Sequence, residues 1–169
     1  RPSQGVALQF MSSLVERAST AITNGDGSLE TREKAYRELL SDGFDMKFIA
    51  RISLGKYWRR ISKAERQAYI DLFAEFVLKS YAPRLGGFDP SRFHVNDAVQ
   101  RGKKDMLVRT SIDQPSGPAI AAGWRVRLVK GSPKIVDIVV EGVSMAINQR
   151  REFVSVMSRT GISGLMEML

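Results

Sequence analysis

The hydrophobic pattern of this chain changes its period about halfway along the sequence. Over residues 6–81, apolar residues recur three and four positions apart, as at Tyr69 and Phe73, and this spacing predicts helices. Over residues 93–140, apolar residues alternate with polar ones, which predicts antiparallel strands with one buried face. Helical spacing returns after Ser144. This order predicts an α+β fold, in which helices pack on a curved antiparallel sheet of about four strands and a C-terminal helix follows.

Local signals define the expected ends of the helices. Ser28, Asp45, Ser62 and Ser144 can each cap a helix through a side-chain oxygen, and Glu65 completes a capping box with Ser62. The expected helices are Val6–Ile22, Leu29–Leu40, Met46–Leu54, Ser62 to about Tyr81, Ser144 to about Arg159, and Ile162–Leu169 after Gly161. The expected breaks are Asn24–Gly27, Gly43, Gly55, and Pro83 with Gly86-Gly87.

The expected strands are separated by turns that contain glycine and proline. These turns are predicted at Gln114–Gly117 and Gly131–Pro133. The apolar residues on the alternating faces are Phe93 and Val95; Met106, Val108 and Ile112; Trp124, Val126 and Leu128; and Val136, Ile138 and Val140.

Composition indicates one folded domain. The chain has 169 residues, of which 43% are hydrophobic and 26% are charged, values typical of a folded chain. We expect a single domain over 1–169, with a helical part at about 1–88, a sheet at about 91–142 and C-terminal helices at about 144–169. The absence of cysteine excludes disulfides, thiolate metal sites and cysteine nucleophiles. No apolar run reaches the ~18 residues that span a bilayer, and no signal peptide is visible.

The sequence offers little for catalysis or metal binding. His94 is the only histidine, so any serine–histidine triad would have to use it. Ser144 lies in a segment that superficially resembles a nucleophile elbow, but the closing glycine is missing, and a helix cap is the better interpretation. We interpret His94 as a surface or hydrogen-bonded structural residue. No carboxylate cluster has the spacing of a metal site, and we expect no catalytic residue, metal or cofactor.

A net charge of +8 favours anionic partners, whether nucleic acid, anionic lipid surfaces or acidic proteins. One basic cluster surrounds Tyr57 and Trp58, which are candidates for stacking on nucleic-acid bases. The clusters are otherwise dispersed and follow no nucleic-acid module, so we expect no nucleic-acid partner. The clustered basic residues are Lys56, Arg59, Arg60, Lys63 and Arg66; Arg101, Lys103 and Lys104; and Arg150 and Arg151.

Two segments carry distinctive motifs. The first contains Phe44-Asp45-Met46, Ile49-Ala50-Arg51 and Leu54-Gly55-Lys56-Tyr57-Trp58-Arg59. The second contains Val136-Asp137-Ile138 and Val140-Glu141-Gly142-Val143-Ser144, followed by Asn148, Arg150, Phe153, Gly161 and Leu165. In their order and spacing, from about Leu8 to Leu169, these motifs resemble the MlaC family of periplasmic phospholipid carriers, with mild departures at Met145 and Gln149.

The resemblance implies a nuclear-transport-factor-2-like cone, extended by helices, around a deep apolar cavity. It also implies a non-catalytic periplasmic carrier whose cargo is a phospholipid held by its acyl chains. The implied partners are an outer-membrane lipoprotein complex and an inner-membrane ABC transporter complex, with transient contact to a membrane surface.

The helical stripe and the inward face of the sheet are the surfaces expected to hold acyl chains. The predicted lipid-binding residues are Phe48, Ile52, Tyr57, Trp58, Phe73, Phe76, Val77, Tyr81, Trp124, Val126, Leu128, Ile138 and Val140. The predicted residues for docking on partners or membrane are Lys56, Arg59, Arg60, Arg101, Lys103 and Lys104.

Two other functions stay open at this point. Cone-shaped folds also hold small-molecule enzymes that use a pocket carboxylate, and Asp137 and Glu141 are the candidates here. Strict alternation places both on the face opposite Ile138 and Val140, which argues against them unless a bulge reorients one. A basic nucleic-acid or scaffold module is the third interpretation, and a steep salt dependence of nucleic-acid affinity would support it.

Overall fold

The computed structural model describes residues 1–23, 28–85 and 89–169, so the predicted breaks at Asn24–Gly27 and Gly86-Gly87 lie outside the described residues. The helices are α1 (Gln4–Thr23), α2 (Leu29–Gly43), α3 (Met46–Leu54), α4 (Lys63–Leu85) and α5 (Met145–Met168), with short 3₁₀ helices η1 (Gly55–Arg60) and η2 (Pro90–Arg92). The strands are β1 (Phe93–Arg101), β2 (Asp105–Ile112), β3 (Ile120–Val129), β4 (Ser132–Val140) and β5 (Val143–Ser144).

The strands form one antiparallel sheet in sequence order, so the predicted α+β fold is confirmed. A fifth strand of two residues, β5, extends the expected four. The β3–β4 turn is shorter than predicted, because Val129 pairs directly with Ser132. Lys130 (φ 51°) and Gly131 (φ 83°) form this two-residue turn, and positive φ at both positions is typical of a type I′ hairpin.

The helix caps form as the sequence predicts. Ser28 accepts from the Thr31 amide, Asp45 from the Phe48 amide and Ser144 from the Ile147 amide. The capping box also forms, because Ser62 accepts from the Glu65 amide at 3.1 Å and Glu65 accepts from the Ser62 amide at 2.8 Å. Helix α4 continues beyond the predicted end at Tyr81 to Leu85. Residue Pro83 therefore lies within the helix, and the predicted break at this position is wrong.

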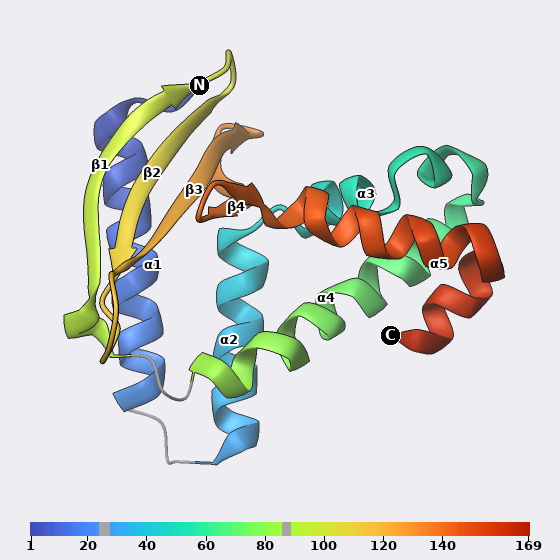
Figure 1. Ribbon diagram of the computed structural model, residues 1–169, viewed down its shortest axis with the longest axis horizontal. Helices are drawn as coiled ribbons and strands as arrows, with labels where there is room; N and C mark the ends of the chain where they lie inside the picture. Colours follow the sequence, from blue (N-terminus) through green and yellow to red (C-terminus); the bar gives the residue numbers. More distant parts are fainter. Residues whose placement is uncertain (24–27, 86–88) are drawn as a thin grey trace.

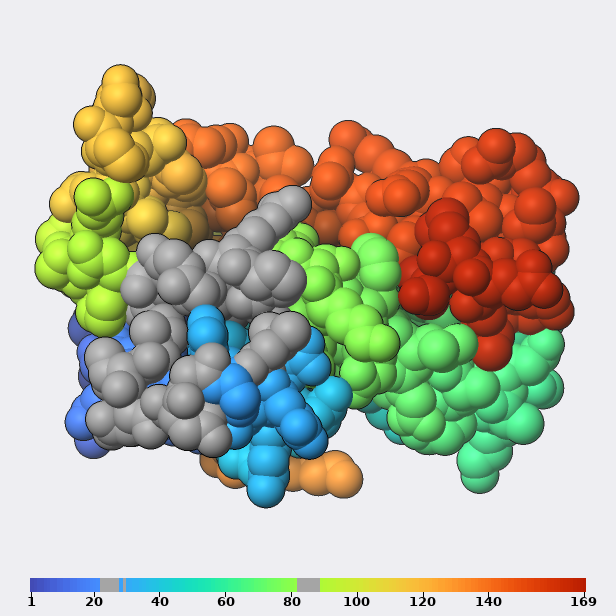
Figure 2. Space-filling view, turned by 90° about the horizontal axis from the view of Figure 1, so that it is seen from below, coloured from blue at the N-terminus to red at the C-terminus, as the bar shows by residue number. Residues whose placement is uncertain are grey.

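The sheet and the helices divide the molecule into two ends. Figure 1 shows α1 lying along the sheet, whereas α5 leaves the sheet and runs with α4 toward the opposite end. Seen from below in Figure 2, the C-terminal part of α5 and the first part of α4 form the end farthest from the sheet. Helix α2 lies between α1 and α4 and connects the two ends (Figure 1).

Three separate clusters of buried apolar residues follow this division. The sheet cluster joins α1 to the strands through Met11, Val108 and Val126. The helical cluster joins α3, η1, α4 and α5 through Leu54, Tyr69 and Phe153. A small third cluster, the α2–α4 cluster, contains Tyr36, Leu78, Ala21 and Leu40. The sheet therefore packs on α1 at one end of the molecule, whereas α3, η1, α4 and α5 pack on one another at the other end.

Candidate functional site

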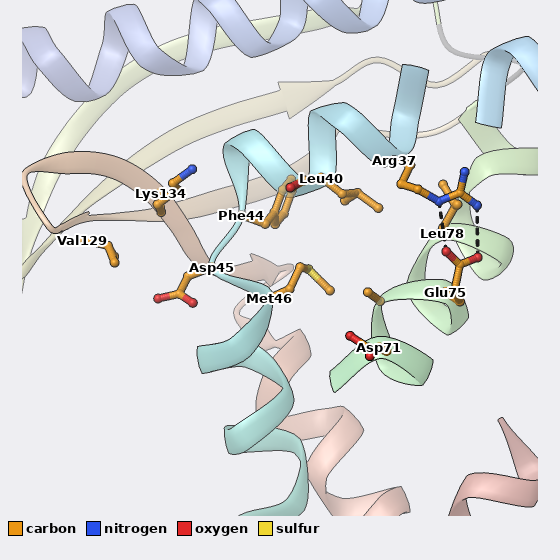
Figure 3. A pocket seen from close by; sticks show the side chains of 12 residues that line it. Arg37, Leu40, Phe44, Asp45, Met46, Asp71, Glu75, Leu78, Val129 and Lys134 are labelled. Carbon is orange, nitrogen blue, oxygen red and sulfur yellow. Dashed lines mark hydrogen bonds and ion pairs between the residues drawn. The ribbon is translucent and has the colours of Figure 1, made fainter. Parts of the chain in front are cut away.

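A pocket of about 550 Å³ opens between α2, α4 and the β3–β4 hairpin. This volume lies within the range of about 300–1,000 Å³ that is usual for small-ligand pockets. Its lining residues are Arg37, Leu40, Ser41, Phe44, Asp45, Met46, Asp71, Ala74, Glu75, Leu78, Val129 and Lys134. Figure 3 shows that these side chains come from both helices, from the start of α3 and from the hairpin.

The two main walls are helix faces with regular spacing. On α4, the lining positions 71, 74, 75 and 78 follow the i, i+3, i+4, i+7 pattern of one helix face. On α2, positions 37, 40 and 41 follow the same pattern. Leu40, Ala74 and Leu78 give both walls an apolar part, so the pocket can hold a hydrophobic group.

The link between α2 and α3 places two further apolar side chains at the pocket. Gly43 ends α2 where α1 comes close, since a Cβ at this position would lie 2.9 Å from a methyl carbon of Leu14. Phe44 then becomes extended and bridges to Ile135 of β4, whose carbonyl accepts from the Asp45 amide at 3.0 Å. Because Asp45 next caps α3, Phe44 and Met46 are held in the pocket wall.

Charged side chains surround this apolar lining. Arg37 of α2 donates two hydrogen bonds to Glu75 of α4, at 3.0 and 3.2 Å, and Figure 3 shows this pair crossing between the helices. These hydrogen bonds, more than the charge of Arg37, lower the pKa of Glu75 below its ordinary value. Lys134 donates to the Asp42 carbonyl oxygen at the hairpin side. An apolar lining with charged groups around it suits an amphiphilic ligand.

The thirteen predicted lipid-binding residues do not form this lining. Trp58 and Phe73 belong to the helical cluster, with Tyr57, Phe76 and Val77 packed against it. The sheet cluster contains Val126, with Trp124 packed against it. Phe48 and Ile52 on α3 and Ile138 and Val140 on β4 are half-buried, and the Arg127 guanidinium lies 4.9 Å from the centre of the Phe48 ring. Tyr81 and Leu128 are exposed.

Trp124 is a predicted residue that contacts the pocket wall. Its ring packs edge-to-face on Phe44, with centroids 6.5 Å apart, and its indole N–H donates to the Thr110 hydroxyl at 3.0 Å. Thr110 in turn donates to the Ala122 carbonyl, so the indole is fixed from behind.

Sequence reasoning missed Leu40, Phe44, Met46, Ala74 and Leu78. A signal for the last two was present, because positions 71, 74, 75 and 78 form a second face of α4 beside the more aromatic stripe. Phe44 and Met46 contributed to the family resemblance. They lie at the link between two helices, where hydrophobic periodicity does not predict which way a side chain faces.

The six predicted docking residues are all exposed, but they form two groups. Lys56, Arg59 and Arg60 lie on η1, at the helical end of the molecule. Arg101, Lys103 and Lys104 lie at the β1–β2 turn, which Figure 1 shows at the sheet end.

The candidate catalytic groups have structural contacts. His94 Nε2 lies 2.7 Å from Asp113 Oδ2, and both side chains are about half exposed, as expected for a hydrogen-bonded surface histidine. Asp137 accepts from the Ser144 hydroxyl and from the Ala146 amide, so it supports the start of α5. Within the described part of the chain, His, Asp and Glu side chains form no group of three that could hold a metal ion.

Glu141 does not continue β4 as strict alternation assumed. With Gly142 it occupies a two-residue turn at positive φ, 49° and 81°, between the paired residues Val140 and Val143. Its carboxylate accepts from the Ala121 amide at 2.8 Å, and neither it nor Asp137 lines the pocket.

The fold defines a class of α+β proteins in which helices pack on an open antiparallel sheet, here with a partly apolar pocket between α2, α4 and the β3–β4 hairpin. Residues 11–169 match the family described as MlaC protein, and this chain belongs to that family. Across residues 1–23, 28–85 and 89–169, no helix has both the length and the apolar character needed to cross a membrane.

Two individual proteins are similar to this chain. The intermembrane phospholipid transport system binding protein MlaC of Haemophilus influenzae is 26% identical over 116 residues, which cover 66% of this chain and 54% of that protein. The chain thus spans about half the length of this curated relative. The phospholipid-binding protein from Ralstonia solanacearum, solved in complex with a phospholipid, has a TM-score of 0.81 at 20% identity, over 98% of this chain and 94% of that one. This second likeness supports the fold.

Proposed function

We propose that this protein is a non-catalytic periplasmic carrier that holds a phospholipid by its acyl chains. It would pass this cargo between an outer-membrane lipoprotein complex and an inner-membrane ABC transporter complex. Membership of the MlaC family supports the proposal, as do the name of the Haemophilus relative and the phospholipid bound by the Ralstonia protein. The observation that carries it in this chain is the pocket between α2 and α4, with its apolar walls and charged surroundings.

The energetics of lipid transfer explain why such a pocket is needed. Each acyl methylene exposed to water costs ~0.8 kcal/mol, so two long chains cost on the order of 20 kcal/mol or more. The pocket touches all three apolar clusters: Leu40 and Leu78 belong to the α2–α4 cluster, Met46 packs on the helical cluster, and Phe44 contacts Trp124 of the sheet cluster. Acyl chains that enter there would lie between these clusters.

This arrangement keeps a role for the residues predicted from the sequence. Chains longer than the pocket would reach Trp124 and Val126 on the sheet side, or Phe76 and Val77 on the helical side. We therefore propose that Trp124, Val126, Phe76 and Val77 form the deeper wall of the loaded cavity, and that Phe44, Met46, Ala74 and Leu78 form its entrance.

The direct test is native mass spectrometry of the purified protein, followed by organic extraction and lipid analysis. We expect one phospholipid per chain, or uptake of one phospholipid from vesicles if purification removes the cargo. A protein that carries no lipid and also takes none up from vesicles would refute the proposal.

A pair of tryptophan substitutions on α4 tests the location of the site. Ala74 lines the pocket, whereas Ala68 is exposed on the same helix. Ala74→Trp should fill the pocket and reduce lipid loading at least tenfold, while Ala68→Trp should load as the wild type does. Equal loading of both variants would place the acyl chains elsewhere.

A further inference from the structure

The helical end of the molecule carries a concentration of basic side chains without acidic partners. Between Lys47 and Arg66 the sequence contains seven basic residues and one acidic residue, Glu65. Within the described residues, none of these seven takes part in an ion pair, and Glu65 is used in the capping box with Ser62. Their charge is therefore directed to solvent or to a partner.

Three arginines of the strands, unlike the basic residues around η1, have acidic partners. Arg109 is paired with Asp97, and both Arg125 and Arg127 are paired with Asp105. These three arginines of the strands therefore have acidic partners, whereas the seven basic residues between Lys47 and Arg66 have none among the described residues.

Specific contacts gather the unpaired cations around η1. Lys56 and Arg60 both lie over the Tyr57 ring, at 5.4 and 5.3 Å from its centre. Arg66 of α4 lies 5.0 Å from the centre of the Trp58 ring and donates to the Trp58 carbonyl at 2.9 Å. These contacts bring cations of η1 and α4 onto one surface.

Helix α5 adds a further cation to the same place. At Gly55, where η1 begins with φ at 55°, a Cβ would lie 3.1 Å from the Arg150 side chain. Only a glycine allows this approach together with this backbone conformation. We define the η1 surface as Lys56, Tyr57, Arg59, Arg60, Arg66 and Arg150.

We propose that the η1 surface docks the protein on anionic phospholipid bilayers. Clustered cations gain roughly a factor of five in partition each beside an anionic lipid surface, and the six residues that define the η1 surface include no carboxylate. Tyr57 adds an amphipathic ring of the kind that lies at headgroup level. The inference rests on the proposed function, because docking would bring the carrier to the membrane from which its cargo comes.

The composition of the surface favours lipid over an acidic protein as the partner. The buried centre of a protein–protein interface is depleted in charge and rich in apolar contact. The η1 surface has the opposite character, since cations flank its one half-buried aromatic ring. A fluid layer of anionic headgroups can adjust to such an array, whereas a protein would need fixed carboxylates opposite each cation.

The β1–β2 turn provides a matched control within the same chain. Arg101, Lys103 and Lys104 are exposed, and in the described structure they form no ion pair. They equal Lys56, Arg59 and Arg60 in number and charge but lie at the other end of the molecule (Figure 1). Neutralising either group changes the net charge equally.

The experiment measures flotation with vesicles of equal parts phosphatidylcholine and phosphatidylglycerol, at low and at physiological salt. The wild type should bind these vesicles, bind pure phosphatidylcholine poorly, and release as salt rises. The variant K56Q/R59Q/R60Q should lose on the order of a hundredfold in partition, while R101Q/K103Q/K104Q should lose less than threefold. Equal losses, or no binding by the wild type, would overturn the proposal.

A second variant guards against misfolding, because Lys56 and Arg60 contact Tyr57. Among the described residues the exposed Arg59 makes no such ring contact, and R59Q should weaken vesicle binding roughly fivefold with an unchanged unfolding midpoint. Unchanged vesicle binding by this folded variant would contradict the proposal.

Lipid content separates this proposal from the carrier function. Extracted phospholipid should be the same in both triple variants and the wild type. A wild type that carries no lipid and takes none up from vesicles would refute the carrier function, while its vesicle binding still tests the surface. If the η1 variant instead lost affinity only for an acidic membrane-complex subunit, the surface would be a protein interface and the lipid assignment would be wrong.

Discussion

At the scale of single residues, Asp105 is the charge on which the sheet depends most. This carboxylate is 1% exposed, and it accepts from Arg127 Nε at 2.6 Å and pairs with Arg125 Nη2 at 2.7 Å. Asp105→Asn would leave two guanidinium groups without their counter-charge. We expect the free energy of unfolding to fall by about 3 kcal/mol, the lower end for a broken buried pair, because both arginines reach solvent. Urea unfolding measures this change.

Asp97→Asn is the matched control for Asp105. Asp97 pairs with Arg109 on the same sheet, but both side chains are about half exposed, so solvent already screens their interaction. The midpoint of unfolding in urea should hardly move. Similar losses for both variants would mean that burial does not decide the strength of these pairs.

The buried Tyr69 should make the stability of the folded protein depend on pH in the alkaline range. The side chain is fully buried, and burial raises its pKa above the ordinary value. Since Ser53 donates its own proton to the Ala50 carbonyl at 2.6 Å, the Tyr69 hydroxyl is the donor in the 2.6 Å contact between the two side chains.

The unfolded chain ionises this tyrosine above about pH 10 and the folded protein keeps the proton, so stability is complete below that pH and falls as pH rises. Each proton retained in this way contributes a slope of about 1.4 kcal/mol per pH unit. Tyr69→Phe should reduce the slope of unfolding free energy between about pH 10 and 11 by one proton. Part of the slope should remain, because burial also raises the pKa of Tyr36. An unchanged slope would contradict the assignment.

At the scale of elements, local signals predict where helices begin and end. Gly161 is one such signal, and replacing it should lower the stability of the protein by a measurable amount. Gly161 divides α5 with φ at 71° and ψ at −173°, a conformation open essentially to glycine alone. The segment after it returns Leu165, which is fully buried, to the helical cluster.

Gly161→Ala should therefore destabilise the protein by about 1–3 kcal/mol, as measured by thermal or urea unfolding. Gly5→Ala is the control, because Gly5 lies in α1 with open space around its Cα, and alanine there should leave stability equal or slightly higher. A loss of stability in the Gly5 variant but not in the Gly161 variant would contradict this prediction.

Elements also show where sequence reasoning stops. Periodicity identified α4 as amphipathic, but the helix has two useful faces, and the aromatic stripe with Tyr69 and Phe73 packs on α5 instead of facing the pocket. In β4, a bulge places Arg125 opposite Asp137 but Val126 opposite Ile135, so alternation is interrupted and both Ile135 and Val136 are buried. The hydrophobic period of one helix does not show which other element packs on its apolar face. The period of one strand does not show where a one-residue bulge lies.

At the scale of the whole molecule, the family resemblance supplied what periodicity could not. The α+β order, the caps and the break at Gly161 follow from local chemistry, and the structure agrees with each. The pocket depends instead on how α2, α4 and the β3–β4 hairpin pack together, which involves residues about ninety positions apart in the sequence, such as Arg37 and Val129. A hydrophobic pattern with a period of two to four residues does not show which residues so far apart in the sequence come into contact.

The separation of the apolar clusters leads to a prediction about cargo and stability. Because the clusters at the two ends meet at the pocket, an acyl chain that fills it should add to the contacts between α2 and α4, which are otherwise the small α2–α4 cluster and exposed pairs such as Arg37–Glu75. Phospholipid at a hundred times its dissociation constant adds about 2.7 kcal/mol to the stability of the folded state. For a domain of this size that raises Tm by about 5–10 °C.

Scanning calorimetry on delipidated and reloaded protein measures this shift, and hydrogen exchange locates it. Protection should rise in α2 and α4, whereas the centre of the sheet, which is already packed on α1, should exchange alike in both states. The Ala74→Trp variant should show neither the rise in Tm nor the added protection, since its side chain occupies the space of the cargo. Identical exchange with and without lipid would mean that the helices do not depend on the cargo, and that the pocket is as rigid when empty as when filled.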